Sequence, residues 1–110
     1  MSRGWVPDAG EIVWIDFDPQ AGHEQGGHRP GVVLSPASYN GLTGLAICVP
    51  LTTRIKGYRF EVPIGGETAS VAQADHLKSL DWRVRGAKRK GRVSAAELEA
   101  IRARARVLVG

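Results

Sequence analysis

Cysteine is almost absent from this chain of 110 residues, which contains a single one, Cys48. One cysteine excludes an internal disulfide, and its place in the apolar run 45–49 predicts a buried, unreactive thiol. No group of cysteine and histidine residues has the spacing of metal ligands, so we expect no metal ion and no other cofactor. Such sparing use of cysteine fits a cytoplasmic protein.

Long apolar runs are also missing. None approaches the roughly 18 residues that a membrane-spanning helix needs, and residues 1–5 lack the apolar core of a signal peptide. A hydrophobic content of 43% and a charged content of 24% are ordinary for a globular protein. We therefore expect one domain over residues 1–110, with no membrane contact and a core that needs no disulfide.

Acidic residues are scarce in the last third of the chain. Residues 1–77 hold five Lys and Arg against eight Asp and Glu, a net charge of −3, whereas residues 78–110 hold ten against three, a net charge of +7; the two sum to +4. This asymmetry predicts a polyanion or an acidic protein as partner. Most of the signal lies in the basic segment 83–92. The adjacent Trp82 has the chemistry to stack on a base, although a core position is its more common role.

Short apolar runs between turn residues predict strands in most of the chain. They cover residues 11–17, 31–35, 45–52, 58–64 and 70–77, followed by a strand and a loop, or two short strands, within 83–93. The run 45–52 is apolar almost throughout, so we expect it to be central, with a bulge or an edge contact at Pro50. Turns are expected at 39–41 and 80–82.

The C-terminal segment has a clear helical pattern. Ser94 and Glu97 have the spacing of a capping box. Apolar residues then repeat at helical spacing, namely Leu98, Ile101, Ala105 and Leu108. Short strands followed by one helix predict a mainly β fold, a small, strongly bent sheet or barrel that the C-terminal helix closes.

Residues 22–30 form a glycine-rich loop with more charge than a turn requires. Seven residues, 23–29, contain Glu24, two histidines and Arg29. Neighbouring strand ends lie close together in a small barrel, so we expect Arg29 to share a pocket with Thr52 or Thr53. Nearby polar residues complete the expected set: Lys56, Gln73, Asp75, His76 and Lys78.

Such a set suits a phosphodiester. The guanidinium of Arg29 matches two phosphate oxygens, the hydroxyl of Thr52 can bind a third, and together they would stabilise the extra charge of a phosphorane. RNA supplies its own nucleophile, the 2′-OH, so the protein needs a base and an acid but no metal ion. Glu24, His23 and His28 are the candidates for proton transfer. Ordinary structural roles would fit each of these residues equally well when it is taken alone.

The order of these motifs resembles the MazF/PemK family of toxin endoribonucleases. The resemblance runs over essentially the whole chain and is carried by GEIVWIDFDP at 10–19, EQGGHRPGVVLSP at 24–36, VPLTT at 49–53, KGY at 56–58 and ADHLKS at 74–79.

The resemblance implies a small SH3-like barrel of the MazF/CcdB type, with five to seven short strands and a C-terminal helix. It implies a homodimer and a toxin that cuts single-stranded RNA, messenger RNA above all, without a metal ion. The products would be a 2′,3′-cyclic phosphate and a 5′-OH. The acidic, disordered tail of a cognate antitoxin would cover the RNA site.

Matched by motif, Arg29 and Thr52 are the catalytic pair, with Glu24 as a loop residue of the active site. Residues expected near the RNA are Gln25, His28, Thr53, Lys56, Asp75 and Lys78. Because an arginine is a poor proton shuttle, Arg29 is assigned first to charge stabilisation and Glu24 to the base. A pair of histidines, His28 and His76, stays open as another solution.

Two other functions compete with the ribonuclease. A non-catalytic toxin of the same fold would poison a protein target such as DNA gyrase through its helix. A general RNA-binding module would bind RNA in a salt-dependent way without cutting it. The pairing of Arg29 with Thr52 favours the ribonuclease, because neither binder needs it.

Overall fold

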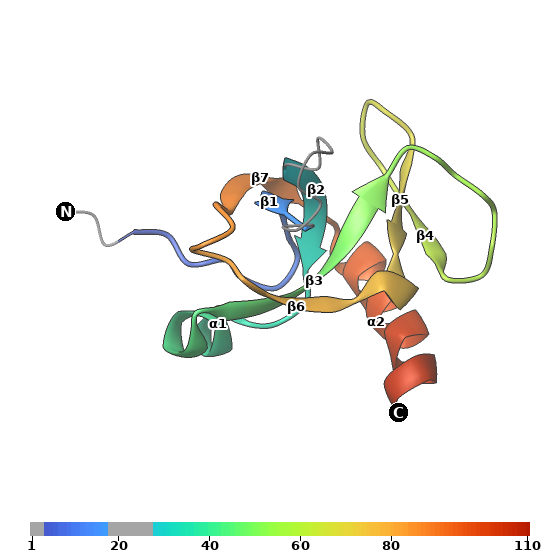
Figure 1. Cartoon of the computed structure of the whole chain (residues 1–110). Coiled ribbons are helices and arrows are strands. Elements are labelled where there is room, and N and C mark those ends of the chain that lie inside the picture. The colour runs from blue at the N-terminus through green and yellow to red at the C-terminus, as the bar shows by residue number, and fades with distance from the viewer. Residues whose placement is uncertain (1–3, 18–27) are drawn as a thin grey trace.

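The computed structural model describes residues 4–17 and 28–110, whose strands form one strongly curved antiparallel sheet (Figure 1). The strand order is β4-β5-β3-β2-β1-β7, and β6 pairs with β3 beside this path. The strands are β1 (Glu11–Asp16), β2 (His28–Val33), β3 (Leu45–Thr52), β4 (Glu61–Ile64), β5 (Ser70–Gln73), β6 (Lys78–Asp81) and β7 (Lys88–Arg92). The predicted mainly β fold with a C-terminal helix is confirmed.

Strand β3 is the centre of the sheet, as its apolar sequence predicts. One edge of it pairs with β2, while the other edge pairs first with β6 and then, at Leu51 and Thr52, with β5. Pro50 lies just before this change of partner and opposite Gly31 of β2. Thr52, the last residue of β3, therefore lies beyond the end of the ladder with β2, where β3 pairs with β5.

Buried side chains form two clusters. One lies beneath helix α2 (Ala95–Val109) and includes Val32, Val49 and Ile101. The other contains Val13, Ile15, Phe17, Cys48, Leu80 and Trp82. Burial raises the pKa of the Cys48 thiol to about 12, which confirms the buried cysteine. Trp82 is also in this core, where its indole N–H donates to the carbonyl of Asn40 at 2.9 Å.

Helix α2 begins with the expected capping box. The hydroxyl of Ser94 accepts from the backbone N–H of Glu97 at 3.0 Å, and the carboxylate of Glu97 accepts from the backbone N–H of Ser94 at 2.8 Å. Ile101 and Ala105 are the buried residues of the helix. It packs on β4 and on the short 3-10 helix η2 (Ala74–His76), at one end of the curved sheet (Figure 1).

The turn expected at 39–41 is wrong, because these residues belong to helix α1 (Ala37–Thr43). Turn-type residues form a helix here because distant groups hold them. The carboxylate of Asp8 accepts from the backbone N–H of Ala37. Asn40 is fully buried, with its amide donating to the carbonyls of Pro7 and Ser35.

Several strand boundaries also differ from the expected ones. Strand β2 begins at His28 rather than 31. Strand β4 begins at Glu61 rather than 58. The reason for the second difference is that the Glu61 carboxylate accepts from the backbone N–H groups of Lys56 and Gly57, which folds the segment before β4 back as a loop. The run 70–77 is split between β5 and η2, and the turn expected at 80–82 begins only after β6. In 83–93 the strand-and-loop alternative is correct.

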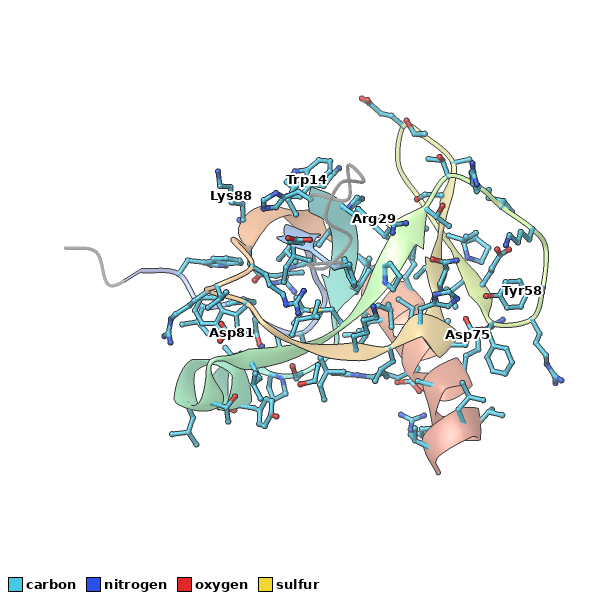
Figure 2. The ribbon with its side chains drawn as sticks, in the orientation of Figure 1. Trp14, Arg29, Tyr58, Asp75, Asp81 and Lys88 are labelled. Atoms are coloured by element: carbon cyan, nitrogen blue, oxygen red, sulfur yellow. The ribbon has the colours of Figure 1, made fainter. Side chains whose placement is uncertain are left out.

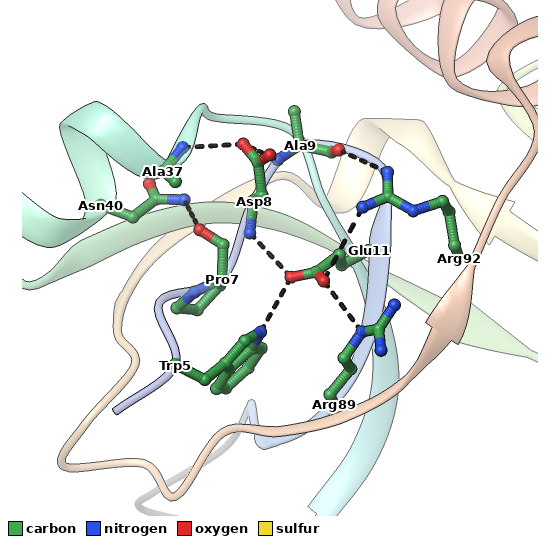
Figure 3. A network of polar contacts seen from close by, with 9 residues as sticks. All are labelled: Trp5, Pro7, Asp8, Ala9, Glu11, Ala37, Asn40, Arg89 and Arg92. Atoms are coloured by element: carbon green, nitrogen blue, oxygen red, sulfur yellow. Dashed lines mark hydrogen bonds and ion pairs between the residues drawn. The ribbon is translucent and has the colours of Figure 1, made fainter. Parts of the chain in front are cut away.

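A buried carboxylate ties the first strand to the last one (Figure 3). Glu11, 5% exposed, accepts from the indole N–H of Trp5 at 3.1 Å, the backbone N–H of Asp8 at 2.9 Å and Nε of Arg89 at 2.9 Å. Arg92 approaches the same carboxylate at 3.8 Å. The network fixes β7 against β1.

Candidate functional site

Two adjoining cavities open at the end of the curved sheet, and Arg29 and Thr52 line both. The larger has a volume of about 560 Å³ and the smaller about 340 Å³. We call the first the base cavity, because its lining suits a nucleobase. It is lined by Ile12, Arg29, Pro30, Leu51, Thr52, Thr53, Ile64, Gly65, Gly66, Glu67, Thr68, Ser70 and Lys90. The second is the cationic cavity, lined by Phe17, Arg29, Pro50, Thr52, Arg54, Lys56, Gln73, His76 and Lys78.

Strand register explains why Arg29 meets Thr52. In the ladder between β2 and β3, Val33 pairs with Cys48, Val32 with Val49 and Gly31 with Pro50. The same register, continued two residues further, sets Arg29 opposite Thr52. Figure 2 shows Arg29 at this open end, beside the tip of β3. The expectation that the two residues share a pocket agrees with this geometry.

A local hydrogen bond orients the hydroxyl of Thr52. Its oxygen accepts from the backbone N–H of Arg54 at 3.0 Å. One proton and a lone pair of the hydroxyl are then left for a ligand. Thr52 is therefore a pre-oriented donor beside a guanidinium, a combination that suits an anionic oxygen.

The cationic cavity concentrates positive charge. Its described lining contains Arg29, Arg54, Lys56 and Lys78 but no carboxylate. The Lys78 ammonium lies 3.5 Å from the carbonyl of Phe17, and the loop that carries Lys56 is held by Glu61. A polyanion is the ligand that this field attracts.

Apolar side chains line the base cavity, and a glycine-containing rim borders it. Ile12, Pro30, Leu51 and Ile64 supply the apolar surface. The rim, residues 65–68, is bound to helix α2, since the Glu97 carboxylate accepts from the backbone N–H of Gly65 at 2.8 Å. This bond and the one from Ser94 lower the pKa of Glu97. A flat apolar group such as a nucleobase suits such a lining.

Two predicted RNA contacts lie outside both linings. The imidazole of His28 is exposed, and its Nε2 lies 3.2 Å from the carbonyl of Gly86, in the turn before β7. The carboxylate of Asp75 accepts from the hydroxyl of Tyr58 at 2.9 Å, a bond that raises the pKa of Tyr58. Thr53, Lys56 and Lys78, by contrast, line the cavities.

Glu24 and Gln25 lie outside the described residues, as does His23. Their expected places in the active-site loop therefore stay predictions. Of the proton-transfer candidates within the described residues, His76 lines the cationic cavity, whereas His28 is directed to Gly86.

The basic segment 83–92 is largely engaged in structural contacts. Arg89 and Arg92 face Glu11, Arg85 donates to the carbonyl of Asp16, and the Arg83 guanidinium lies 4.5 Å from the centre of the Trp82 ring. Lys90 is the member that lines the base cavity. The sequence did not distinguish Lys90 from the other basic residues of this segment, because its position depends on how β7 pairs with β1.

Neither a metal cluster nor a membrane span appears in the described part of the chain. No three His, Cys, Asp or Glu side chains within residues 4–17 and 28–110 are grouped to hold a metal ion. No helix among these residues is both long and apolar enough to cross a membrane.

Together the two cavities can bind an anion and an adjacent planar group through arginine, lysine, a hydroxyl and an apolar surface.

Known proteins resemble this sequence, one of them over its full length. Residues 8–109 match the family described as PemK-like, MazF-like toxin of type II toxin–antitoxin system. The chain is 55% identical to the endoribonuclease toxin MazF of Escherichia coli K12, with both chains covered completely. It is 37% identical to the endoribonuclease PemK of Escherichia coli, over 78% of this chain and 69% of that one.

Solved structures share the fold as well. The crystal structure of MazF from Deinococcus radiodurans superposes with a TM-score of 0.88 and 50% identity, covering 97% of this chain and 99% of that one. A crystal structure of MazE–MazF from the same organism gives a TM-score of 0.85 and 44% identity, with 97% and 98% covered.

Proposed function

We propose, since the chain belongs to the PemK-like, MazF-like toxins of type II toxin–antitoxin systems, that its two cavities are the RNA-cleavage centre. The resemblance seen in the sequence is confirmed, and the chain is a homologue of endoribonuclease toxins. The single observation that carries the proposal for the site is that Arg29 and Thr52 line both cavities.

The proposed reaction is an internal transesterification of single-stranded RNA. The 2′-oxygen attacks the adjacent phosphorus and loses its proton to a base, while the bond from phosphorus to the 5′-oxygen breaks and that oxygen gains a proton. The products are a 2′,3′-cyclic phosphate and a 5′-OH. Atoms and charge balance without a redox partner or a metal ion, and cutting messenger RNA would stop translation and growth.

Arg29 and Thr52 stabilise the charge that develops at phosphorus. The guanidinium donates to two phosphate oxygens in a geometry that matches the dianionic phosphorane. The Thr52 hydroxyl, oriented by the N–H of Arg54, donates to a non-bridging oxygen. Because this hydroxyl is already held in place, it needs no reorganisation during the reaction, which adds to its catalytic effect.

Glu24 is our proposed base for the 2′-OH. The proposal follows from its place in the sequence, five residues before Arg29. A carboxylate supplies the proton acceptor that Arg29 cannot. Gln25, beside it, is proposed to contact the RNA.

The cavities differ in the part of the RNA that each suits. A base next to the cleaved bond occupies the base cavity against its apolar side chains, and Thr53 is among the polar residues of the lining. Lys56 and Lys78 bind phosphates on the side of the cationic cavity. His28 and Asp75 lie outside these linings. If either residue contacts RNA, the contact would be with nucleotides that extend beyond the two cavities.

The same positive charge supports an antitoxin partner. MazE–MazF complexes are among the similar solved structures. An acidic, disordered tail of a cognate antitoxin would be attracted to the cationic cavity and would exclude RNA from it. Competition between RNA and a synthetic acidic tail peptide, measured by fluorescence anisotropy, tests this partner.

We also propose a homodimer. Apolar side chains remain exposed at the end of α2 and near it, with Val107 at 72%, Val109 at 74% and Leu77 at 37% exposure. Leu77 and Val109 border a groove of about 310 Å³ between α2 and the sheet. Light scattering at micromolar concentration that reports only monomer would contradict the dimer.

Incubation of the chain with a mixed RNA pool in EDTA, followed by mapping of 5′-OH ends, tests the function. We expect cuts at a short recurring sequence and cyclic phosphate on the upstream fragments. Binding without cleavage would instead identify an RNA-binding module, and an absence of both would leave a protein-directed toxin.

A further inference from the structure

Trp14 is an exposed aromatic residue at the edge of the base cavity. On strand β1 its neighbours Val13 and Ile15 are both fully buried, and the alternation of the strand turns Trp14 outward, where it is 39% exposed. Trp82, by comparison, is 6% exposed. The Trp14 ring therefore lies outside the core and is free to meet a ligand on part of its surface.

The sheet places this ring beside the proposed RNA path. Trp14 pairs with Pro30 of β2 on one side and with Lys88 of β7 on the other. Pro30 lines the base cavity and directly follows Arg29. Figure 2 shows Trp14 between Lys88 and Arg29, along the upper rim of the sheet.

A β-bulge directs Lys90 to the same place. Strand β7 pairs Gly91 with Ile12 and Arg89 with Val13, so that Lys90 is the extra residue where the register shifts. Its ammonium lies 5.2 Å from the centre of the Trp14 ring, and the residue lines the base cavity. Bulges re-aim side chains in this way, often next to active sites.

The bulge is firmly held. Arg89, on one side of it, donates to the buried carboxylate of Glu11 at 2.9 Å, and Arg92, on the other side, lies 3.8 Å from that carboxylate. The network of Figure 3 thus directs Arg89 and Arg92 toward Glu11, whereas Lys90 lines the base cavity. The bulge therefore brings a lysine, and neither of these two arginines, to this cavity.

We propose that Trp14 and Lys90 form an additional RNA subsite, in which the exposed part of the indole stacks on the base that follows the one in the base cavity and the ammonium binds the phosphate between them. Aromatic rings stack on any base, and a lysine adds a point charge for phosphate. The subsite rests on the proposed function, because it extends the RNA path past Arg29 and Thr52. The subsite would add one nucleotide to the length of RNA that the protein binds.

Binding measurements with modified RNA test the subsite. The probes are ten-nucleotide RNAs centred on a mapped cleavage site, with 2′-deoxyribose at the attacking nucleotide so that they are not cut. One probe is complete, and the others carry an abasic ribose at each flanking position in turn. Fluorescence anisotropy gives the Kd of each probe for the wild-type chain and its variants.

For the wild-type chain, we expect one flanking abasic position to weaken binding about tenfold. Trp14→Ala should bind the complete RNA about tenfold more weakly and lose the penalty at that position alone, whereas Trp14→Phe should keep most of both effects. Lys90→Met should lower the slope of log Kd against log salt by about one, with the abasic penalty kept. Arg83→Met, at an exposed arginine outside both cavities and outside the groove proposed for the dimer, is the charge control and should change neither.

The subsite is overturned if Trp14→Ala retains every abasic penalty or binds the complete RNA as tightly as the wild type. In that case Trp14 and Lys90 form only a surface cation–π pair. A wild-type chain that cuts no RNA would instead overturn the proposed function, and the subsite with it. The two failures are distinguishable because cleavage is scored on the wild type, while stacking is scored on the variants.

Discussion

Arg29 of β2 and Thr52 of β3 line the same two cavities, and the register of these strands aligns them when it is extended two residues beyond its last pair. The strands are antiparallel, so residues 23 positions apart in the chain meet where the sheet opens. This relationship makes the end of the sheet a place where one phosphate can contact a guanidinium and a hydroxyl together. The predictions below test the site and the contacts that hold it in place.

Replacing His28 should leave the chemistry intact. Its imidazole is directed to the carbonyl of Gly86 and lines neither cavity. We expect His28→Ala to cut RNA within about threefold of the wild-type single-turnover rate, since loss of a proton-transfer group would cost about a hundredfold or more. A loss of that size would restore the mechanism with two histidines.

Glu97 should matter to both stability and substrate binding. Its carboxylate caps α2 at Ser94 and holds the cavity rim at Gly65. We expect Glu97→Ala to lower the free energy of unfolding by about 1 kcal/mol and to raise the KM for RNA. Denaturant titration and steady-state cleavage measure the two effects. Glu99→Ala, on the same helix but paired only on the surface with Arg106 at 3.4 Å, is the matched control and should change little.

The effect of Glu97 should depend on pH in a defined direction. Its hydrogen bonds lower the pKa of the carboxyl from the ordinary 4.5. Its contribution to stability is therefore fully present above pH 4.5 and is lost as the pH falls through the lower pKa of the folded state. The difference in unfolding free energy between wild type and Glu97→Ala should thus shrink only below pH 4.5. A difference that vanished already at pH 6 would contradict the assigned bonds.

Cys48 should resist alkylation in the folded protein. Burial raises its pKa to about 12 from 9.0, so the thiolate population at pH 8 falls by about a thousandfold, in addition to the loss of access. Iodoacetamide should label the folded chain at least about a hundredfold more slowly than the chain in guanidinium chloride, where the thiol regains its ordinary pKa. Labelling at equal rates would show that the core around Cys48 opens readily.

Removing the buried carboxylate of Glu11 should destabilise the whole sheet. Three donors, from Trp5, Asp8 and Arg89, would lose their acceptor. We expect Glu11→Ala to lower the free energy of unfolding by about 2 kcal/mol. Glu67→Ala, on the exposed rim, should stay within about 0.5 kcal/mol of the wild type. Equal stability of the two variants would argue that the Figure 3 network contributes little.

Patterns local in sequence predicted much of this fold. The capping box of Ser94 and Glu97 and the apolar run that became β3 both depend on nearby residues, and both were predicted correctly. Helix α1 was missed because distant groups decide it: Asp8 caps Ala37, and Asn40 is buried against Pro7. Turn-forming residues give no sign of such partners.

The shared pocket of Arg29 and Thr52 was predicted from the sequence, and both residues line the two cavities. Arg29 and Thr52 follow from two neighbouring strands, so their pocket was foreseeable. Lys90 was not, because it reaches the cavity through a bulge that sequence alternation does not reveal. The contribution of the rim 65–68 also depends on a bond across the fold, from Gly65 to Glu97.

Single-turnover cleavage by Arg29→Ala, in EDTA and with a substrate mapped from the RNA pool, tests the central claim most directly. We predict a rate lower by about a hundredfold or more, with an unchanged circular dichroism spectrum and melting temperature. Arg83→Ala, at an exposed arginine outside both cavities and outside the groove proposed for the dimer, should cut within about twofold of the wild type. A folded Arg29→Ala chain that cuts RNA at the wild-type rate would contradict the assignment of Arg29 and Thr52 as the cleavage centre.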